Sequence, residues 1–162
     1  MEKNAIYGIA EVLFNEEAMG WIEKGSWDWG GQKAEATDIE AEQVPDAPVL
    51  TLLQRNATIN PKFNIIQLNY KNFKMALGGT LVGTEKEPTG WKAPTTLVEL
   101  EGKLELKFVS GQTMTIPNGM LLANLGGKLT LTEVSKLECE VKVNKPADGS
   151  APYEINDTEP KS

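Results

Sequence analysis

The stretch that decides the fold is KLELKFVSGQTMTIP, Lys103–Pro117. Charged and apolar side chains alternate through its first half, and polar and apolar side chains alternate through its second half. Successive side chains of a β-strand point to opposite faces, so this period of two indicates two half-buried strands. Ser110 and Gly111 supply a turn signal between them. The sequence therefore predicts an antiparallel hairpin whose apolar face is formed by Leu104, Leu106, Phe108, Met114 and Ile116.

The same alternation recurs on both sides of this hairpin. LECEVKV (Leu137–Val143) and KLTLT (Lys128–Thr132) both alternate, but Val134 between them falls out of phase with both, which predicts a bulge or bend between two strands. Nearer the N-terminus, further strands are expected in NAIYGIAEVLF, MGWIEKGSW, PVLTLLQRNATI and KFNIIQLN. Many short strands separated by turn signals predict a mainly β fold of two packed antiparallel sheets, either a β-sandwich or a barrel.

One segment, Tyr70–Leu77, predicts a helix. Asn69 is a suitable N-cap, and Gly78 with Gly79 is a suitable stop signal. A helix of about two turns is too short to found a helical bundle, so we expect it to flank a sheet.

The chain of 162 residues is expected to form one β-sandwich domain over residues 1–145. Two segments interrupt the strand pattern and are expected to be exposed arms. Residues 30–47 are acidic and rich in alanine, and residues 78–95 are punctuated by glycine and proline. Residues 146–162 are polar, contain three prolines and lack apolar periodicity, so we expect a flexible C-terminal tail there.

Composition restricts the class of partner. The net charge is −7, from 23 acidic and 16 basic residues, and this disfavours a nucleic-acid grip, which depends on clustered Lys and Arg. The same acidity keeps a protein soluble and would let DNA pass without sticking. No apolar run approaches the roughly 20 residues of a membrane span, and the N-terminal residues lack a secretory pattern. The single cysteine, Cys139, precludes an intramolecular disulfide and fits a reducing compartment.

The residues of most catalytic sites are missing. The chain contains no histidine, which removes the commonest general base and the commonest metal ligand. Five carboxylates are candidates for the two acidic residues of a glycosidase. We interpret them as solvated surface charges: Glu16, Glu17, Asp28, Glu85 and Glu87. The segment GGTLVG, residues 78–83, lacks the lysine and hydroxyl of a phosphate-binding loop. We therefore expect no enzyme, and no catalytic, cofactor-binding or metal-binding residues.

The remaining candidates for function are large apolar side chains in the expected arms. Trp91 is an isolated aromatic residue between Gly90 and Lys92, and we interpret it as an anchor that reaches an adjacent subunit. Exposed aromatic residues in loops are used by protein interfaces and by sugar-binding platforms alike. The candidate subunit-interface residues are Trp91, Leu81, Val82 and Trp29.

The order of these segments resembles a known family, the major tail tube proteins of long-tailed bacteriophages and, more loosely, the tube proteins of related injection machines. The resemblance covers residues 4–147 and rests on a fixed order without a sharp motif. The strand AMGWIEKGSW is followed by the acidic ATDIEAEQVPDAPVL, the helix with its glycine pair YKNFKMALGG, the loop GWKAP and the hairpin GKLELKFVSGQTMTIPNG.

This resemblance implies a structural virion protein without catalytic residues or cofactors. Such subunits close into rings, usually of six copies, and the rings stack into a hollow tail tube through which DNA passes without specific binding. The implied partners are copies of the chain itself and other tail proteins. No contact with a membrane is implied. The implied locations are the virion tail and, during assembly, the cytoplasm of the bacterial host.

Two alternative functions stay open at this point. The same composition permits another tail structural protein, such as a terminator or an adaptor between ring layers. Exposed tryptophans also permit a non-catalytic carbohydrate-binding β-sandwich, although the expected absence of an export signal disfavours it.

Overall fold

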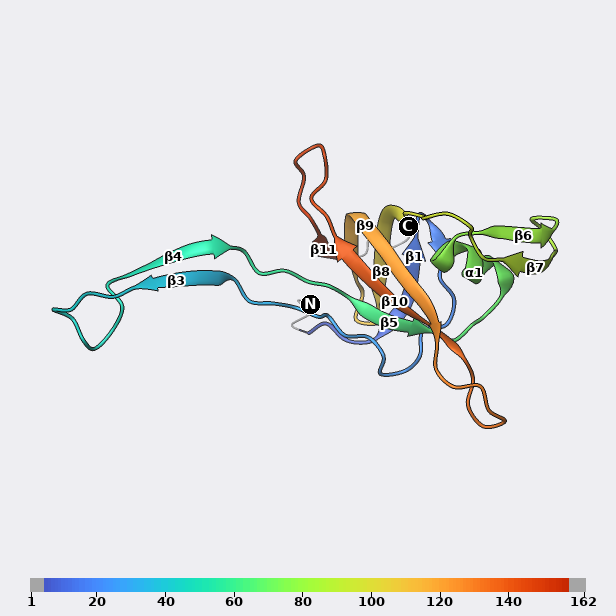
Figure 1. Cartoon of the computed structure of the whole chain (residues 1–162), viewed down its shortest axis with the longest axis horizontal. Coiled ribbons are helices and arrows are strands. Elements are labelled where there is room, and N and C mark those ends of the chain that lie inside the picture. The colour runs from blue at the N-terminus through green and yellow to red at the C-terminus, as the bar shows by residue number, and fades with distance from the viewer. Residues whose placement is uncertain (1–4, 158–162) are drawn as a thin grey trace.

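The computed structural model describes residues 5–157 of the chain (Figure 1). Within this range the elements follow in the order β1 (Ile9–Phe14), β2 (Glu17–Ala18), β3 (Glu35–Ile39), β4 (Leu50–Arg55), β5 (Lys62–Ile65), α1 (Tyr70–Leu77), β6 (Thr80–Gly83), β7 (Pro88–Lys92), β8 (Glu101–Phe108), β9 (Gln112–Gly126), β10 (Lys136–Val143) and β11 (Glu154–Asp157).

The main sheet has seven strands, in the order β2-β1-β8-β9-β10-β5, with β11 also paired to β9. All these pairs are antiparallel. The predicted hairpin is confirmed as β8 and β9, in which Leu106 lies opposite Met114 and Leu104 lies opposite Ile116. Strands β3 and β4 form a separate two-stranded sheet, and so do β6 and β7.

Strand β9 joins the two halves of the main sheet. Its first part pairs with β8 and β11, and its second part pairs with β10. The register shifts where Leu104 pairs with Ile116 but Gly102 pairs with Gly119, so β9 carries one extra residue. A bulge of this kind bends a strand and exchanges the faces of its side chains. Accordingly Ile116 is buried before the bulge, and Leu121 is buried after it.

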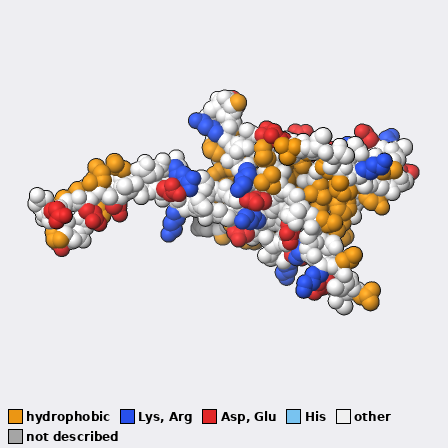
Figure 2. All heavy atoms as spheres, in the orientation of Figure 1, with side chains coloured by type: hydrophobic (Ala, Val, Ile, Leu, Met, Phe, Trp, Pro, Cys, Tyr) orange, Lys and Arg blue, Asp and Glu red, His pale blue; other side chains and the backbone are white. Residues whose placement is uncertain are grey.

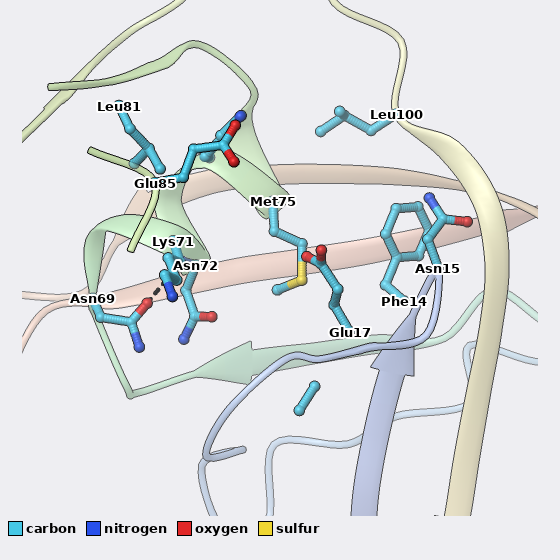
Figure 3. A pocket seen from close by; sticks show the side chains of 12 residues that line it. Phe14, Asn15, Glu17, Asn69, Lys71, Asn72, Met75, Leu81, Glu85 and Leu100 are labelled. Carbon is cyan, nitrogen blue, oxygen red and sulfur yellow. Dashed lines mark hydrogen bonds between the residues drawn. The ribbon is translucent and has the colours of Figure 1, made fainter. Parts of the chain in front are cut away.

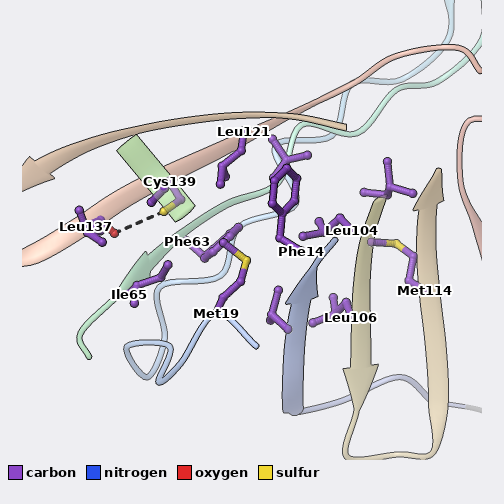
Figure 4. Close-up of a cluster of buried hydrophobic side chains, with 14 of the residues drawn as sticks. Phe14, Met19, Phe63, Ile65, Leu104, Leu106, Met114, Leu121, Leu137 and Cys139 are labelled. Atoms are coloured by element: carbon purple, nitrogen blue, oxygen red, sulfur yellow. Dashed lines mark hydrogen bonds between the residues drawn. The ribbon is translucent and has the colours of Figure 1, made fainter. Parts of the chain in front are cut away.

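Buried apolar side chains from both halves of the sheet form one core with α1 (Figure 4). Its members are Val12, Phe14, Met19, Phe63, Ile65, Ala76, Leu104, Leu106, Phe108, Met114, Ile116, Leu121, Leu137, Cys139 and Val141. The predicted class, a mainly β protein of antiparallel sheets with one short helix, is confirmed. The barrel alternative is wrong, because the sheets do not close, and the two expected layers are halves of one continuous sheet.

The helix has the bounds and caps that the sequence predicts. The side chain of Asn69 accepts a hydrogen bond of 2.8 Å from the backbone N–H of Asn72, and the N–H of Gly78 donates to the carbonyl of Lys74. The helix buries Asn72 and Ala76 against the body, and the amide of Asn72 donates to the carbonyl of Gln67. These contacts fix one flank of the pocket described below.

The strand expected at Lys128–Thr132 is absent, because these residues form the loop between β9 and β10. Leu129 and Leu131 are 87% and 107% exposed. The hydroxyl of Thr130 accepts hydrogen bonds from the backbone N–H groups of Thr132 and Glu133, which curls the segment into a turn. Alternation predicts a strand only where a neighbouring strand is available to pair, and this loop has none.

The tail expected over residues 146–162 contains a strand that the sequence analysis missed. Residues Glu154–Asp157 form β11 and pair with the edge of β9 from Gln112 to Thr115. Every residue of β11 is exposed, so its order rests on backbone pairing and leaves no apolar period in the sequence. Residues 158–162 lie outside the described part of the chain.

Candidate subunit interface

A two-stranded arm, residues 32–58, projects from one end of the body (Figure 1). It contains β3 and β4, and every residue of both strands is exposed. At its base, Gln32 and Thr58 exchange backbone hydrogen bonds of 2.9 and 3.0 Å. A strand rises about 3.3 Å per residue, so the ribbon from Gln32 to Ile39 is roughly 23 Å long. The arm therefore presents both of its faces to the surroundings.

One face of the arm is apolar. Ile39 lies opposite Leu50 and Thr37 lies opposite Leu52, and cross-strand partners share a face. Ile39, Leu50 and Leu52 are 41%, 51% and 44% exposed. Figure 2 shows hydrophobic side chains along the arm, away from the body. A two-stranded hairpin without further packing is marginally stable in water, so this face is suited to contact another surface.

The arm is also acidic. Within residues 34–54 there are five carboxylates and no Lys or Arg. Glu35 forms an ion pair with Arg55 at the base, and Asp38 accepts a hydrogen bond from the hydroxyl of Thr51. Among the described residues no ion pair joins the three carboxylates near the tip, which are Glu40, Glu42 and Asp46.

Two anchors hold the base of the arm on the sheet. Glu23 accepts hydrogen bonds from Asn64 and Lys136, and these lower the pKa of Glu23. On the returning strand, the amide of Asn60 donates to Glu140 at 2.6 Å. This hydrogen bond, followed by that of Lys142, lowers the pKa of Glu140. The chain is therefore held on the sheet both before and after the arm.

The hairpin of β6 and β7 lies at the other end of the molecule and carries three of the predicted interface residues (Figure 1). Trp91 is half-buried, and its ring stacks on Phe73 of α1 with centroids 5.2 Å apart. Its indole Nε1–H donates a 2.8 Å hydrogen bond to the carbonyl of Gly78. Leu81 lies opposite Trp91, and Val82 is exposed. Trp91 thus clamps the hairpin to its own helix, where the sequence analysis expected an aromatic anchor reaching an adjacent subunit.

Gly79 allows this close approach of hairpin and helix. Its φ is +88°, and a Cβ at this position would overlap the carbonyl oxygen of Lys92 and lie 3.1 Å from Nε1 of Trp91. We expect Gly79→Ala to lower the free energy of unfolding by about 2 kcal/mol more than Gly25→Ala does. Gly25 is the matched control, because its φ is +79° and a Cβ there meets nothing within 4 Å. Urea unfolding followed by tryptophan fluorescence measures both, and equal losses would contradict the clamp.

Trp29 lies apart from the other three predicted residues, next to the base of the arm. Its ring packs edge-on against Trp27 at 5.4 Å and lies 6.2 Å from Phe108. Trp27 in turn stacks on the buried Phe63. Trp29 therefore extends the core towards the arm and remains partly exposed.

A pocket of about 730 Å³ opens beside α1 (Figure 3). Apolar side chains from four segments line it: Phe14 of β1, Met75 of α1, Leu81 of β6 and Leu100 before β8. Lys71 and Lys74 of α1 and the carboxylates Glu17 and Glu85 also line it. Figure 2 shows a hydrophobic patch on the body over the position of α1.

The sequence analysis did not find the apolar face of the arm or the pocket. Leu50 and Leu52 belong to PVLTLLQRNATI, where a strand was expected, but strand alternation does not distinguish a buried face from an exposed one. The pocket is assembled from four separate segments, so no local pattern announces it. Its only local signal is the pair of lysines on one short helix without an acidic residue.

Further features of the described residues bear on chemistry and location. No cluster of three or more His, Cys, Asp or Glu side chains within residues 5–157 is arranged to hold a metal ion. In the same range there is no helix with the length and apolar character that crossing a membrane requires. Cys139 of β10 is buried in the core, and burial raises its pKa to about 12.

No protein-family model matches the chain, and a search of curated proteins finds no match either. The resemblance to tail tube proteins therefore remains an expectation from the sequence.

Proposed function

We propose that this chain is a structural subunit that assembles with copies of itself into stacked rings, forming a hollow tail tube for the passage of DNA. The observation that carries the proposal is the arm, a ribbon that holds an apolar face away from its own core. An exposed two-stranded ribbon is only marginally stable by itself. A ribbon of this kind suits a subunit in which it packs on a neighbouring copy.

The two ends of the molecule support head-to-tail assembly. The arm occupies one end, and the hairpin of β6 and β7 with α1 occupies the other (Figure 1). Contacts between two different surfaces of identical subunits generate rings if the rotation closes and filaments if it does not. The net charge of −7 suits a channel that DNA traverses without binding. In this proposal the assembled protein belongs to a virion tail, and its subunits assemble in the cytoplasm of a bacterial host.

The test is assembly of the purified chain, followed by sedimentation velocity and negative-stain microscopy over a range of concentrations. We expect rings that stack into tubes. Leu50→Ser with Leu52→Ser removes the apolar face of the arm, and we expect it to abolish assembly while the circular dichroism spectrum of the subunit stays unchanged. Leu97→Ser is the control, because Leu97 is 93% exposed and lies outside the arm.

Each alternative function gives a different result in the same experiment. Closed rings that never stack would indicate that the protein is a terminator or an adaptor and not a tube subunit. If the chain stays monomeric at every concentration and binds an oligosaccharide array, its function is carbohydrate binding and not assembly. Unimpaired tube formation by the Leu50→Ser, Leu52→Ser variant would show that the arm does not carry the contact.

A further inference from the structure

The pocket beside α1 has no way to receive the arm of its own chain. The arm leaves the body at one end of the long axis of the molecule, and α1 with β6 and β7 lies at the opposite end (Figure 1). Hydrogen bonds of Glu23 and Asn60 hold the segments next to the base of the arm on the sheet, with the arm directed away from the pocket (Figure 1). If the arm enters such a pocket, the pocket belongs to another copy.

The pocket offers apolar contact and positive charge on one side. Its apolar lining comes from Phe14, Met75, Leu81 and Leu100 (Figure 3). On its α1 side, Lys71 and Lys74 are exposed, and no ion pair engages either lysine within residues 5–157. The helix carries no acidic residue to balance them.

The arm offers the complement. It has an apolar face on β3 and β4, and it has three unpaired carboxylates near its tip, Glu40, Glu42 and Asp46. Opposite charges across an interface fix its register and exclude wrong partners, while apolar contact supplies most of the affinity.

We propose that the pocket beside α1 is the receptor for the arm of an adjacent copy, with the acidic tip of the arm facing Lys71 and Lys74. This inference rests on the proposed function and names the surface that completes it. The carboxylates Glu17 and Glu85 line the same pocket, and they orient the arm by repelling its acidic tip towards the helix.

The test reverses the charge of each partner in turn and measures assembly by sedimentation velocity. Lys71→Glu with Lys74→Glu is expected to raise the concentration needed for half-maximal assembly at least tenfold. Adding Glu40→Lys and Glu42→Lys to the same chain restores opposite charges and is expected to recover most of the loss. The exchange tests whether the two sites are coupled, and the control described next removes the general effect of net charge.

The matched control is Lys24→Glu with Lys128→Glu, two exposed lysines outside the arm and the pocket. It changes the net charge by the same amount, so general repulsion between subunits is equal in the two variants. We expect its assembly to match that of the unaltered chain. Circular dichroism and urea unfolding of each variant establish that the subunit remains folded.

Three outcomes overturn the docking proposal. Assembly of the Lys71→Glu, Lys74→Glu variant at the concentration of the control variant would show that these lysines make no contact with the arm. Impaired assembly that the exchange fails to recover would assign the lysines to a different contact. In both cases the unaltered chain still assembles, so the proposed function stands. A chain that never assembles overturns both proposals together.

Discussion

Replacing Phe63 with alanine is expected to lower the free energy of unfolding by about 3–5 kcal/mol. Phe63 of β5 is 1% exposed and lies in the core shared by the two halves of the sheet. Its ring stacks on Trp27 with centroids 5.1 Å apart, and Trp27 also packs edge-on against Trp29. The substitution therefore removes buried apolar contact and leaves a cavity under the aromatic residues next to the arm.

Urea unfolding followed by circular dichroism and by tryptophan fluorescence measures this loss. Tyr7→Ala is a suitable control, because Tyr7 is an exposed aromatic residue and its alanine variant is expected to change stability by about 0.5 kcal/mol or less. If Phe63→Ala does not fold, Phe63→Leu provides a milder loss of about 1–1.5 kcal/mol in the same assay. A loss below 1 kcal/mol for Phe63→Ala would contradict the position of this ring in the core.

The thiol of Cys139 is expected to react with an aromatic disulfide reagent at pH 8 about a thousandfold more slowly in the folded chain than in urea. Burial raises its pKa from 9.0 to about 12, so the thiolate, which is the reactive form, becomes about a thousandfold scarcer. Access through the sheet slows the reaction further. Equal rates in buffer and in urea would place the thiol at the surface.

The same shift gives the stability a defined dependence on pH. Between about pH 9 and pH 12 the unfolded chain loses the thiol proton while the folded chain keeps it. The contribution of Cys139 is therefore fully present below pH 9 and is lost as the pH rises, by up to about 1.4 kcal/mol per pH unit. Subtracting the unfolding free energies of Cys139→Ala isolates this contribution from the titration of lysines and tyrosines.

The elements that the sequence predicted well are those fixed by neighbours along the chain. Residues 103–117 encode a hairpin through alternation and a turn, and its inward face is as expected. The helix at Tyr70–Leu77 is bounded by its own cap and stop, Asn69 and Gly78. Each of these elements depends on hydrogen bonds and side-chain positions that lie within a few residues of each other.

The elements that the sequence predicted poorly depend on what lies across space. KLTLT alternates as clearly as KLECE does, but only the second segment finds strands to pair with, on β9 and β5. Strand β11 lacks an apolar face altogether and is held by the edge of β9. Alternation in the sequence shows only that a segment is able to form a strand. Whether it does so depends on a neighbouring strand with which it can pair.

The candidate interface follows the same rule. Trp91 stood out in the sequence as an isolated aromatic residue, and the structure stacks it on Phe73 of α1 in its own chain. Its hydrogen bond to the carbonyl of Gly78 was not predictable, because that contact arises only when the hairpin closes over the helix. The exposure of the face formed by Ile39, Leu50 and Leu52 was also not predictable, because exposed and buried strands are built from the same types of residue.

The bulged strand β9 determines how the body melts. Because this one strand supplies hydrogen bonds to β8 and β11 along its first part and to β10 along its second, neither half of the sheet is able to detach without disrupting the other. We therefore expect the body to unfold as a single cooperative unit whose amide protons exchange together, and the amide protons of the arm to exchange through local opening. The arm is then expected to change shape on contact with a neighbour without disturbing the sheet of the body.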